Sequence, residues 1–160
     1  MKNAIFLPTP IGEIGIAEEN GAVTNVFFEQ TVRPKEFVRK ETPVLAEAAK
    51  QLNEYFEGKR QTFSLPLTPE GTPFEREVWN ALLSISYGET STYGEIAAAL
   101  GRPGAARAVG RANSQNPVSI FIPCHRVIGK SGALTGYAGG LAAKTFLLTL
   151  EGVLPPTEVR

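Results

Sequence analysis

The 160-residue chain contains one cysteine, one histidine and no aspartate. A single cysteine excludes an internal disulfide and every zinc site that is built on several thiolates. Such sparing use of cysteine is typical of reducing compartments, so we expect a cytoplasmic protein. Because aspartate is absent, any carboxylate that assists the histidine must come from a glutamate. We expect neither a metal nor a cofactor.

The sequence also lacks an apolar run long enough to span a membrane, and its N-terminus lacks the apolar stretch of a secretory signal. We therefore expect no association with a membrane. The apolar fraction of 42% is sufficient for a hydrophobic core. The length predicts one medium domain or two small ones.

The formal net charge is zero, but the charge is unevenly distributed. Residues 88–150 carry six basic and two acidic side chains, which gives this half a net charge of +4 and the remainder −4. A basic half indicates an anionic partner, and nucleic acid is one candidate. The alternative is a mixed, solvated surface.

The only cysteine and the only histidine are adjacent, at Cys124 and His125. The apolar run 118–122 predicts a buried strand, which Pro123 ends because it has no N–H for a ladder. Burial alone raises the pKa of a thiol and makes it unreactive. A neighbouring base usually activates such a thiol by taking its proton. Adjacent side chains of an extended segment point to opposite faces, so the chain must turn here or a water must bridge the two groups. The alternative is a small core cysteine with a chance neighbour.

Residues 1–66 predict a small α/β domain. Asn20 and Gly21 separate two apolar runs and are a strong hairpin signal, because both residues accept positive φ. An apolar stripe with helical spacing follows between Pro43 and Gly58, which predicts a helix.

The stretch 66–71 contains two prolines and a glycine and predicts a linker at residues 67–71. Residues 72–160 predict a mostly helical domain, whose expected helices are 72–85, 92–100, 105–113 and 141–150. The second and third of these helices are joined by a short turn and form a helix-turn-helix in outline.

The second helix of this motif consists mostly of alanine and glycine, with Arg107 and Arg111 on one side. It offers few side chains that could read bases in a major groove. This composition predicts DNA binding through phosphates with little sequence preference, and an arginine is available for insertion. The alternative is an alanine-rich core helix with two solvated arginines.

Two further features lie near the C-terminus. Residues 129–140 form a glycine- and alanine-rich loop around Tyr137, which could bring backbone N–H groups close to a flat ligand or form a surface turn. Glu151 falls in the last turn of the last helix, where a carboxylate opposes the helix dipole. A protonatable histidine would be a suitable partner for Glu151, and the alternative is a solvated side chain.

Taken together, these stretches resemble the O6-alkylguanine-DNA alkyltransferases, also called methylated-DNA–protein-cysteine methyltransferases. The resemblance covers residues 71–152, and the motifs that carry it most strongly are Asn116-Pro117-Val118, Ile122-Pro123-Cys124-His125-Arg126-Val127 and Tyr137-Ala138-Gly139-Gly140-Leu141. It implies an RNase H-like α/β N-terminal domain and a mostly α, winged-helix-like C-terminal domain with the helix-turn-helix. The N-terminal part matches the family only in size and coarse pattern.

The resemblance also implies an activity. The protein would repair double-stranded DNA by transferring the alkyl group of O6-alkylguanine, and of O4-alkylthymine, irreversibly to its own cysteine. Cys124 would accept the alkyl group, His125 would take the thiol proton through a water, and Glu151 would orient His125. Asn116 would brace the site, and Tyr93 would assist the departing guanine. Each molecule, which we expect to be a monomer, would react once.

The resemblance assigns two further sets of residues. The DNA-binding set is Tyr93, Ala106, Arg107 and Arg111, with Arg107 filling the gap left by the flipped nucleotide. The base pocket would be lined by Val127, Tyr137, Ala138 and Gly139. Ala138 departs from the family pattern, because many members have serine there, so backbone N–H groups must carry more of the contact to the base.

Three other classes of protein remain as alternatives. A binding-only relative would have replaced the nucleophilic cysteine, but Cys124 is present. A cysteine hydrolase would need turnover and an oxyanion hole. A transcription regulator would need base-reading side chains on the second helix of the motif, which are missing.

Overall fold

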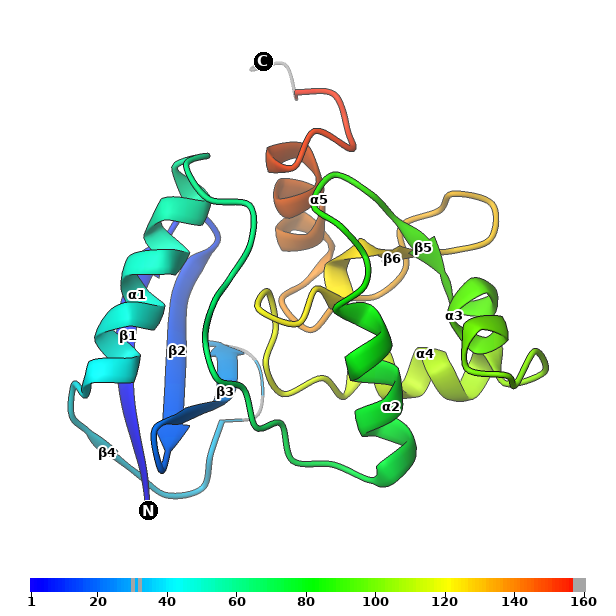
Figure 1. The fold of residues 1–160 in the computed structure, drawn as a ribbon. Helices are drawn as coiled ribbons and strands as arrows, with labels where there is room; N and C mark the ends of the chain where they lie inside the picture. The colour runs from blue at the N-terminus through cyan, green and yellow to red at the C-terminus, as the bar shows by residue number, and fades with distance from the viewer. Residues whose placement is uncertain (30, 32, 157–160) are drawn as a thin grey trace. The chain divides into compact units, whose positions relative to one another are not determined.

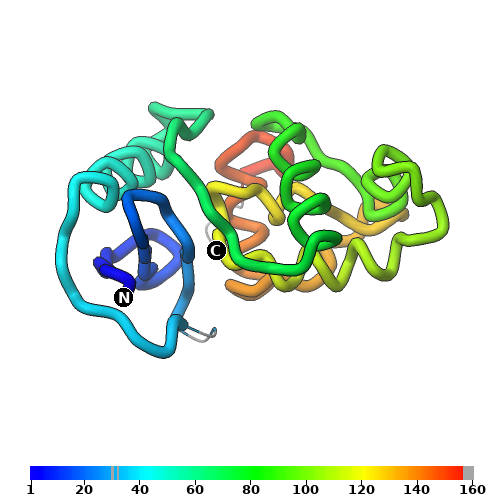
Figure 2. The backbone as a smooth tube through the Cα atoms, turned by 60° about the horizontal axis from the view of Figure 1, so that its bottom comes forward, coloured from blue at the N-terminus to red at the C-terminus, as the bar shows by residue number. Residues whose placement is uncertain are grey.

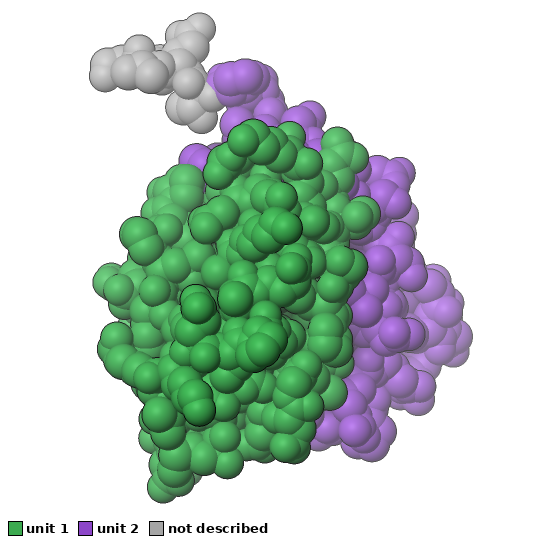
Figure 3. All heavy atoms as spheres, turned by 60° about the vertical axis from the view of Figure 1, so that its left-hand side comes forward, with its two compact units in different colours: residues 1–70, 117–121 green, residues 71–116, 122–160 purple. Residues whose placement is uncertain are grey.

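The structure is a computed structural model that describes residues 1–29, 31 and 33–156 (Figure 1). The chain divides into two compact units. Unit 1 comprises residues 1–70 and 117–121, and unit 2 comprises residues 71–116 and 122–160 (Figure 3). The sequence had placed residues 117–121 with the C-terminal domain. They lie in unit 1 because the Val26 N–H donates to the Pro117 carbonyl at 2.8 Å and Val26 forms a parallel bridge with Val118.

Unit 1 is built on a four-stranded sheet. Its strands are β1 (Lys2–Thr9), β2 (Gly12–Glu19), β3 (Ala22–Phe28) and β4 (Phe37–Arg39). Their order is β3-β2-β1-β4, with β4 parallel to β1 and the other pairs antiparallel. Asn20 and Gly21 have φ values of 55° and 82°, as a hairpin turn between β2 and β3 requires, so the predicted hairpin is confirmed.

The helix α1 (Pro43–Phe56) packs against β1, β2 and β3 (Figures 1 and 2). Its buried apolar residues lie on one stripe at helical spacing and are Leu45, Ala48, Leu52 and Tyr55. Burial of a leucine of this kind stabilises the fold by about 1.5–3 kcal/mol. Gly58 follows the helix with a φ of 76°, so the predicted end is confirmed.

The predicted strand over residues 118–122 is wrong. Val118 forms one isolated bridge, and the chain then turns at Ile120, whose φ is 74°. A β-branched residue rarely adopts positive φ, and this conformation interrupts an extended segment. The apolar run had signalled burial rather than a strand, since all five of its side chains are buried.

Unit 2 is mostly helical. Its helices are α2 (Pro73–Leu82), α3 (Tyr93–Ala99), α4 (Ala106–Ser114) and α5 (Leu141–Leu150). The α2 and α3 helices both begin at capping boxes, in which Thr72 and Thr92 exchange hydrogen bonds with the glutamate three residues later. Trp79 donates its Nε1–H to the Ala112 carbonyl at 2.8 Å and thereby fixes α2 to α4. The four predicted helices are confirmed, although α2 ends earlier than expected.

The α3 and α4 helices pack together and form the predicted helix-turn-helix. Gly101, with a φ of 74°, lies in the turn between them. The two-residue strands β5 (Ser91–Thr92) and β6 (Val127–Ile128) pair in parallel and were not predicted, because strands this short show no periodicity. No helix within the described ranges is long and apolar enough to cross a membrane.

Candidate active site around Cys124

The adjacent cysteine and histidine lie on a single tight turn. Residues Cys124–Arg126 form a 3₁₀ turn, in which the Arg126 N–H donates to the Pro123 carbonyl at 3.0 Å. The chain therefore turns at this point, which is one of the two possibilities that the sequence left open. The turn is deeply buried: Cys124 is 3% exposed, and His125 is not exposed at all.

His125 meets a carboxylate from the far end of α5. Its Nε2 lies 2.7 Å from Oε2 of Glu151, and both side chains are fully buried. The partner expected for the unfavourably placed Glu151 is therefore His125. A carboxylate only accepts, so Nε2 carries the proton and Nδ1 is the acceptor nitrogen.

The electrostatic environment keeps His125 neutral. Burial lowers the pKa of His125 below its usual 6.5, and this effect outweighs the opposing hydrogen bond and charge of Glu151. Nδ1 has no hydrogen-bond partner among the described protein atoms. A neutral imidazole with an available acceptor nitrogen is suited to take a proton from a neighbouring group.

Arg126 is a member of this cluster that the sequence analysis missed. Its Nε and Nη2 donate to the two oxygens of Glu151 at 2.8 and 3.1 Å, and its Nη1 donates to the Ile85 carbonyl at 2.6 Å. The Gly88 N–H donates to Oε1 of Glu151 at 3.3 Å. From the sequence, Arg126 was named only as part of the family motif. A signal for its role would have been its place beside a buried cysteine, because a buried basic residue needs a carboxylate partner.

Two asparagines hold the backbone around the turn. Asn116 donates from Nδ2 to the Ile122 carbonyl at 2.9 Å, which is consistent with the expected bracing role. Asn113, which the sequence analysis missed, donates from α4 to the Cys124 carbonyl at 3.4 Å. The helix-turn-helix is thus tied directly to the backbone of the cysteine.

Tyr93 lies at the first position of α3, beside the turn. The pairing of Ser91 with Val127 brings the start of α3 next to the segment that leaves Cys124. The Tyr93 hydroxyl forms a hydrogen bond with the Thr135 hydroxyl, in the loop 129–140. Thr135 was not identified from the sequence.

Lys144 fixes the same loop from the other side. It is fully buried, and its Nζ donates to the carbonyls of Val127 at 2.6 Å and Thr135 at 3.1 Å. Burial lowers the pKa of Lys144, against the opposing charge effect of Cys124. Lys144 was not identified from the sequence, because a lysine that binds two carbonyls has no local signature.

The residues predicted for a base pocket are only partly brought together. Val127 is buried, and the ring of Tyr137 stands edge-on to His125, with centroids 6.4 Å apart. Gly139 is partly buried, and Ala138 is exposed in the same loop.

The helix α4 presents its arginines on the side away from the core. Val109, Ala112 and Asn113 are buried, whereas Arg107 and Arg111 are exposed. Ala106 begins the helix and is partly buried. A Cβ at Gly110 would lie 3.7 Å from the ring of Tyr93, which is an ordinary packing distance, so α4 lies close to the first residue of α3.

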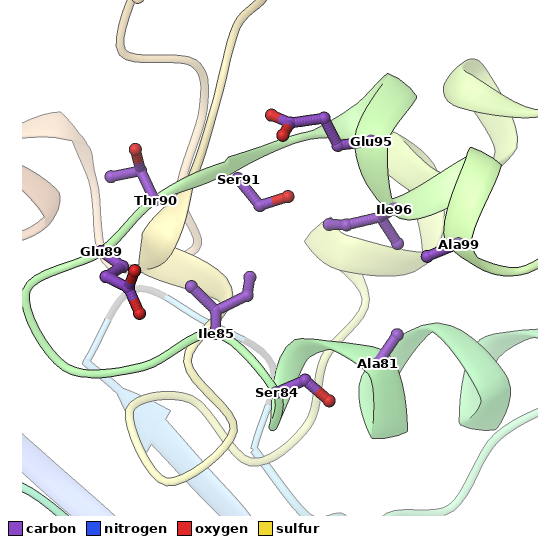
Figure 4. A pocket seen from close by; sticks show the side chains of 9 residues that line it. All are labelled: Ala81, Ser84, Ile85, Glu89, Thr90, Ser91, Glu95, Ile96 and Ala99. Carbon is purple, nitrogen blue, oxygen red and sulfur yellow. The ribbon is translucent and has the colours of Figure 1, made fainter.

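Unit 2 also contains a cavity of about 270 Å³ (Figure 4). It is lined by Ala81, Ser84, Ile85, Glu89, Thr90, Ser91, Glu95, Ile96 and Ala99. None of the residues assigned to the reaction or to the base pocket is in its lining. The described residues contain no group of three or more histidine, cysteine, aspartate or glutamate side chains that could hold a metal ion.

Two family models match the chain. The model described as "6-O-methylguanine DNA methyltransferase, DNA binding domain" matches residues 73–153, and the "ribonuclease-like domain" of the same protein matches residues 4–69. The chain belongs to the 6-O-methylguanine DNA methyltransferase family. The predicted family and its two-domain fold, with a ribonuclease-like N-terminal domain, are therefore confirmed.

Similar members of this family cover nearly all of the chain. A constitutive methylated-DNA–protein-cysteine methyltransferase of Bacillus subtilis is 56% identical over 152 residues, which are 91% of this chain and 92% of the relative. A relative of the same name from Methanosarcina acetivorans is 50% identical over 156 residues, covering 95% and 99%. The Mycobacterium tuberculosis OGT in complex with DNA has a TM-score of 0.88 and 45% identity, and the match covers 93% of this chain and 92% of that one.

Proposed function

We propose that this chain is a methylated-DNA–protein-cysteine methyltransferase that repairs double-stranded DNA by moving the alkyl group of O6-alkylguanine onto Cys124. O4-alkylthymine is its second substrate. The observation that carries the proposal is the buried pair of His125 and Glu151, in which Nε2 and Oε2 are 2.7 Å apart. His125 directly follows Cys124, the only cysteine of the chain. The protein acts as a monomer on chromosomal DNA in the cytoplasm.

The reaction is a displacement at the alkyl carbon. The neutral His125 takes the thiol proton through a water, while Glu151 holds the imidazole in the tautomer that leaves Nδ1 as the acceptor. The sulfur forms a bond to the carbon as the bond from carbon to O6 breaks, and that electron pair leaves with the base. The base takes up one proton and departs as guanine, assisted by the hydroxyl of Tyr93. The proton lost by the thiol balances the proton gained by the base.

The product explains why the protein reacts once. An S-alkyl thioether has no good leaving group, and the chain contains no second thiol that could remove the alkyl group. A cysteine hydrolase would instead return its thiol after each cycle. Single turnover therefore separates this proposal from the alternative of a hydrolase.

The helix-turn-helix supplies the DNA surface. Because the alkylated base lies inside a duplex, it must be rotated out, which costs a few kcal/mol. The DNA contacts are made by Tyr93, Ala106, Arg107 and Arg111. Arg107 is exposed on α4, and it occupies the space that the extruded nucleotide leaves in the stack.

The extruded base is held between the turn and the glycine-rich loop. The pocket residues are Val127, Tyr137, Ala138 and Gly139. Ala138 offers no hydroxyl to O6 of the base, so backbone N–H groups of the loop make that contact.

The stoichiometry of transfer tests the proposed function. The protein is mixed with an excess of duplex DNA that contains O6-methylguanine, and its intact mass is followed. We expect a plateau at one methyl group per chain, located on the peptide that contains Cys124. Cys124→Ser should abolish transfer and retain DNA binding, because a hydroxyl is a far poorer nucleophile at neutral pH. Removal of more than one equivalent of lesion would overturn the proposal.

Arg107→Ala tests the role of α4. We expect the rate of repair in duplex DNA to fall far more than the rate with O6-benzylguanine as a free base, since only the duplex requires extrusion. Arg111→Ala is the matched control on the same helix. It should weaken duplex affinity and lower the salt slope by about one, because it loses a phosphate contact. Equal losses of Arg107→Ala on both substrates would contradict the assignment.

A further inference from the structure

The carboxylate of Glu151 is shared between His125 and a second side chain. Oε1 accepts from Nε of Arg126 at 2.8 Å and from the Gly88 N–H at 3.3 Å. Oε2 accepts from Nε2 of His125 at 2.7 Å and from Nη2 of Arg126 at 3.1 Å. The guanidinium therefore spans both oxygens as a fork, which is the arrangement that fixes a carboxylate most strictly in direction.

Arg126 is itself held in place. Its side chain is 8% exposed, and Nη1 donates to the Ile85 carbonyl, just beyond the end of α2, at 2.6 Å. The ring of Tyr87 lies 5.9 Å from the guanidinium carbon. Because the fork cannot rotate without losing these contacts, it sets the plane of the Glu151 carboxylate and hence the direction in which Oε2 meets His125.

The charges around His125 act on its protonation in opposite directions. Besides burial, which lowers the pKa most, Arg126 on the turn and Lys144 on α5 lower the pKa of His125, whereas Glu151 at the end of α5 raises it. Cys124 precedes it on the turn, and the ring of Tyr137 contacts it from the loop. The negative charge of Glu151 is already matched by Arg126, so a protonated His125 would be an unbalanced buried cation.

We propose that Arg126 is a positioning residue for the alkyl transfer, which acts through Glu151. It directs the carboxylate of Glu151, which orients the imidazole of His125. It also pairs with the negative charge of that carboxylate, which would otherwise stabilise the imidazolium. The inference rests on the proposed function, because it takes His125 as the base for the thiol proton.

The proposal predicts a change in pH dependence that a packing role would not produce. Without the cation, the charge of Glu151 becomes available to a protonated His125, and the imidazole binds a proton more tightly. As the pH falls, His125 therefore becomes protonated, and stops acting as a proton acceptor, at a higher pH than in the wild-type protein. A residue that only filled space would lower the rate by the same factor at every pH.

Two substitutions separate charge from geometry. Arg126→Met removes the charge and retains much of the length, whereas Arg126→Lys retains the charge and loses the fork. Arg60→Met is the matched control, because Arg60 in unit 1 forms an ion pair with Glu54 at 2.9 Å. The readouts are the rate of Cys124 alkylation by O6-benzylguanine as a free base between pH 5 and 9, followed by intact mass, and the imidazole nitrogen signals in NMR. His125 is the only histidine of the chain, so these signals need no assignment.

We expect the acid limb of the wild-type rate profile to lie below pH 6.5, since burial lowers the pKa of His125 from that value. In Arg126→Met the acid limb and the NMR midpoint should both move up by about one pH unit or more. The rate of this variant should therefore recover towards pH 9. In Arg126→Lys the limb should stay near its wild-type position while the rate falls at every pH, and Arg60→Met should match the wild-type protein.

An Arg126→Met variant with a uniformly lowered rate and an unmoved imidazole midpoint would overturn the proposal. Should that variant not fold, Glu151→Gln takes its place. With Arg126 retained and the carboxylate charge removed, the midpoint of His125 must move to lower pH, and an unmoved or raised midpoint contradicts the inference. A wild-type protein that is not alkylated at Cys124 would sink the proposed function instead, and the NMR midpoints would still test the role of Arg126.

Discussion

At the scale of single residues, the contact between Tyr93 and Thr135 joins the helix-turn-helix to the loop that follows the cysteine. The two hydroxyls share a hydrogen bond, and the Thr135 carbonyl is fixed by the buried Lys144. Thr135 therefore holds the Tyr93 hydroxyl in one place. We expect Thr135→Val to slow alkylation of Cys124 by O6-benzylguanine about 3–10-fold, which corresponds to a typical hydrogen bond of about 1 kcal/mol. Thr135→Ser should restore the rate.

A double-mutant cycle checks that this effect passes through the phenol. In a Tyr93→Phe background, Thr135→Val should cause no further loss of rate. Reaction of Cys124 with a small alkylating reagent, which needs no assistance to a departing base, should be unaffected in all three variants. Additive losses in the double variant would show that the two hydroxyls act separately.

At the scale of secondary-structure elements, the two capping boxes of unit 2 stabilise helices with different tasks. Thr72 caps α2, which contributes to the core, and Thr92 caps α3, which begins with Tyr93. Each substitution by alanine should lower the free energy of unfolding by about 1 kcal/mol, because each removes one capping hydrogen bond. We expect only Thr92→Ala to slow alkyl transfer as well, since the first turn of α3 carries Tyr93.

Thr72→Ala is therefore the matched control for Thr92→Ala. Urea unfolding gives the two stabilities, and the rate of alkylation under strongly native conditions gives the activities. Equal rates in the two variants would mean that the first turn of α3 does not need its cap to present Tyr93.

At the scale of the whole molecule, the buried neutral histidine makes stability depend on pH. The pKa of His125 is lowered in the folded state and returns to its ordinary value of about 6.5 on unfolding. Between these two values the unfolded chain binds more protons, so the free energy of unfolding rises with pH in this window and falls on acidification below about pH 6.5. The slope contributed by one proton is at most about 1.4 kcal/mol per pH unit.

Urea unfolding at a series of pH values from 7.5 to 5 measures this slope. His125→Gln is the control, because it removes the only imidazole of the chain. We expect the variant to lose the part of the slope that lies just below pH 6.5. Parallel curves for the two proteins would show that protonation of His125 does not limit stability in acid.

The sequence predicted those parts of the molecule that have a local signature. The hairpin followed from Asn20-Gly21, and the helices followed from their caps and apolar stripes. The pairing of Glu151 with His125 was one of two possibilities raised by a carboxylate at an unfavourable helix end, the other being a solvated side chain.

The missed residues act through contacts that are distant in sequence. Asn113 and Lys144 donate to backbone carbonyls, and any carbonyl of the chain is a candidate acceptor, so the sequence names none. Arg126 and His125 reach the same carboxylate only because a 3₁₀ turn brings adjacent side chains together, whereas an extended segment would separate them. The strand predicted at 118–122 was wrong because a buried turn can be as apolar as a strand.

Because residues Pro117–Phe121 return to unit 1, the chain cannot be cut at the linker into two self-contained fragments. A fragment that begins at Gly71 would carry Val118 and Phe121 without the strand residue Val26 and the ring of Phe63, against which they lie. Exposed apolar side chains of this kind favour aggregation. Recombination between relatives at the linker would likewise pair the segment with a foreign sheet. A division at the linker would therefore separate residues 117–121 from the sheet residue that they contact.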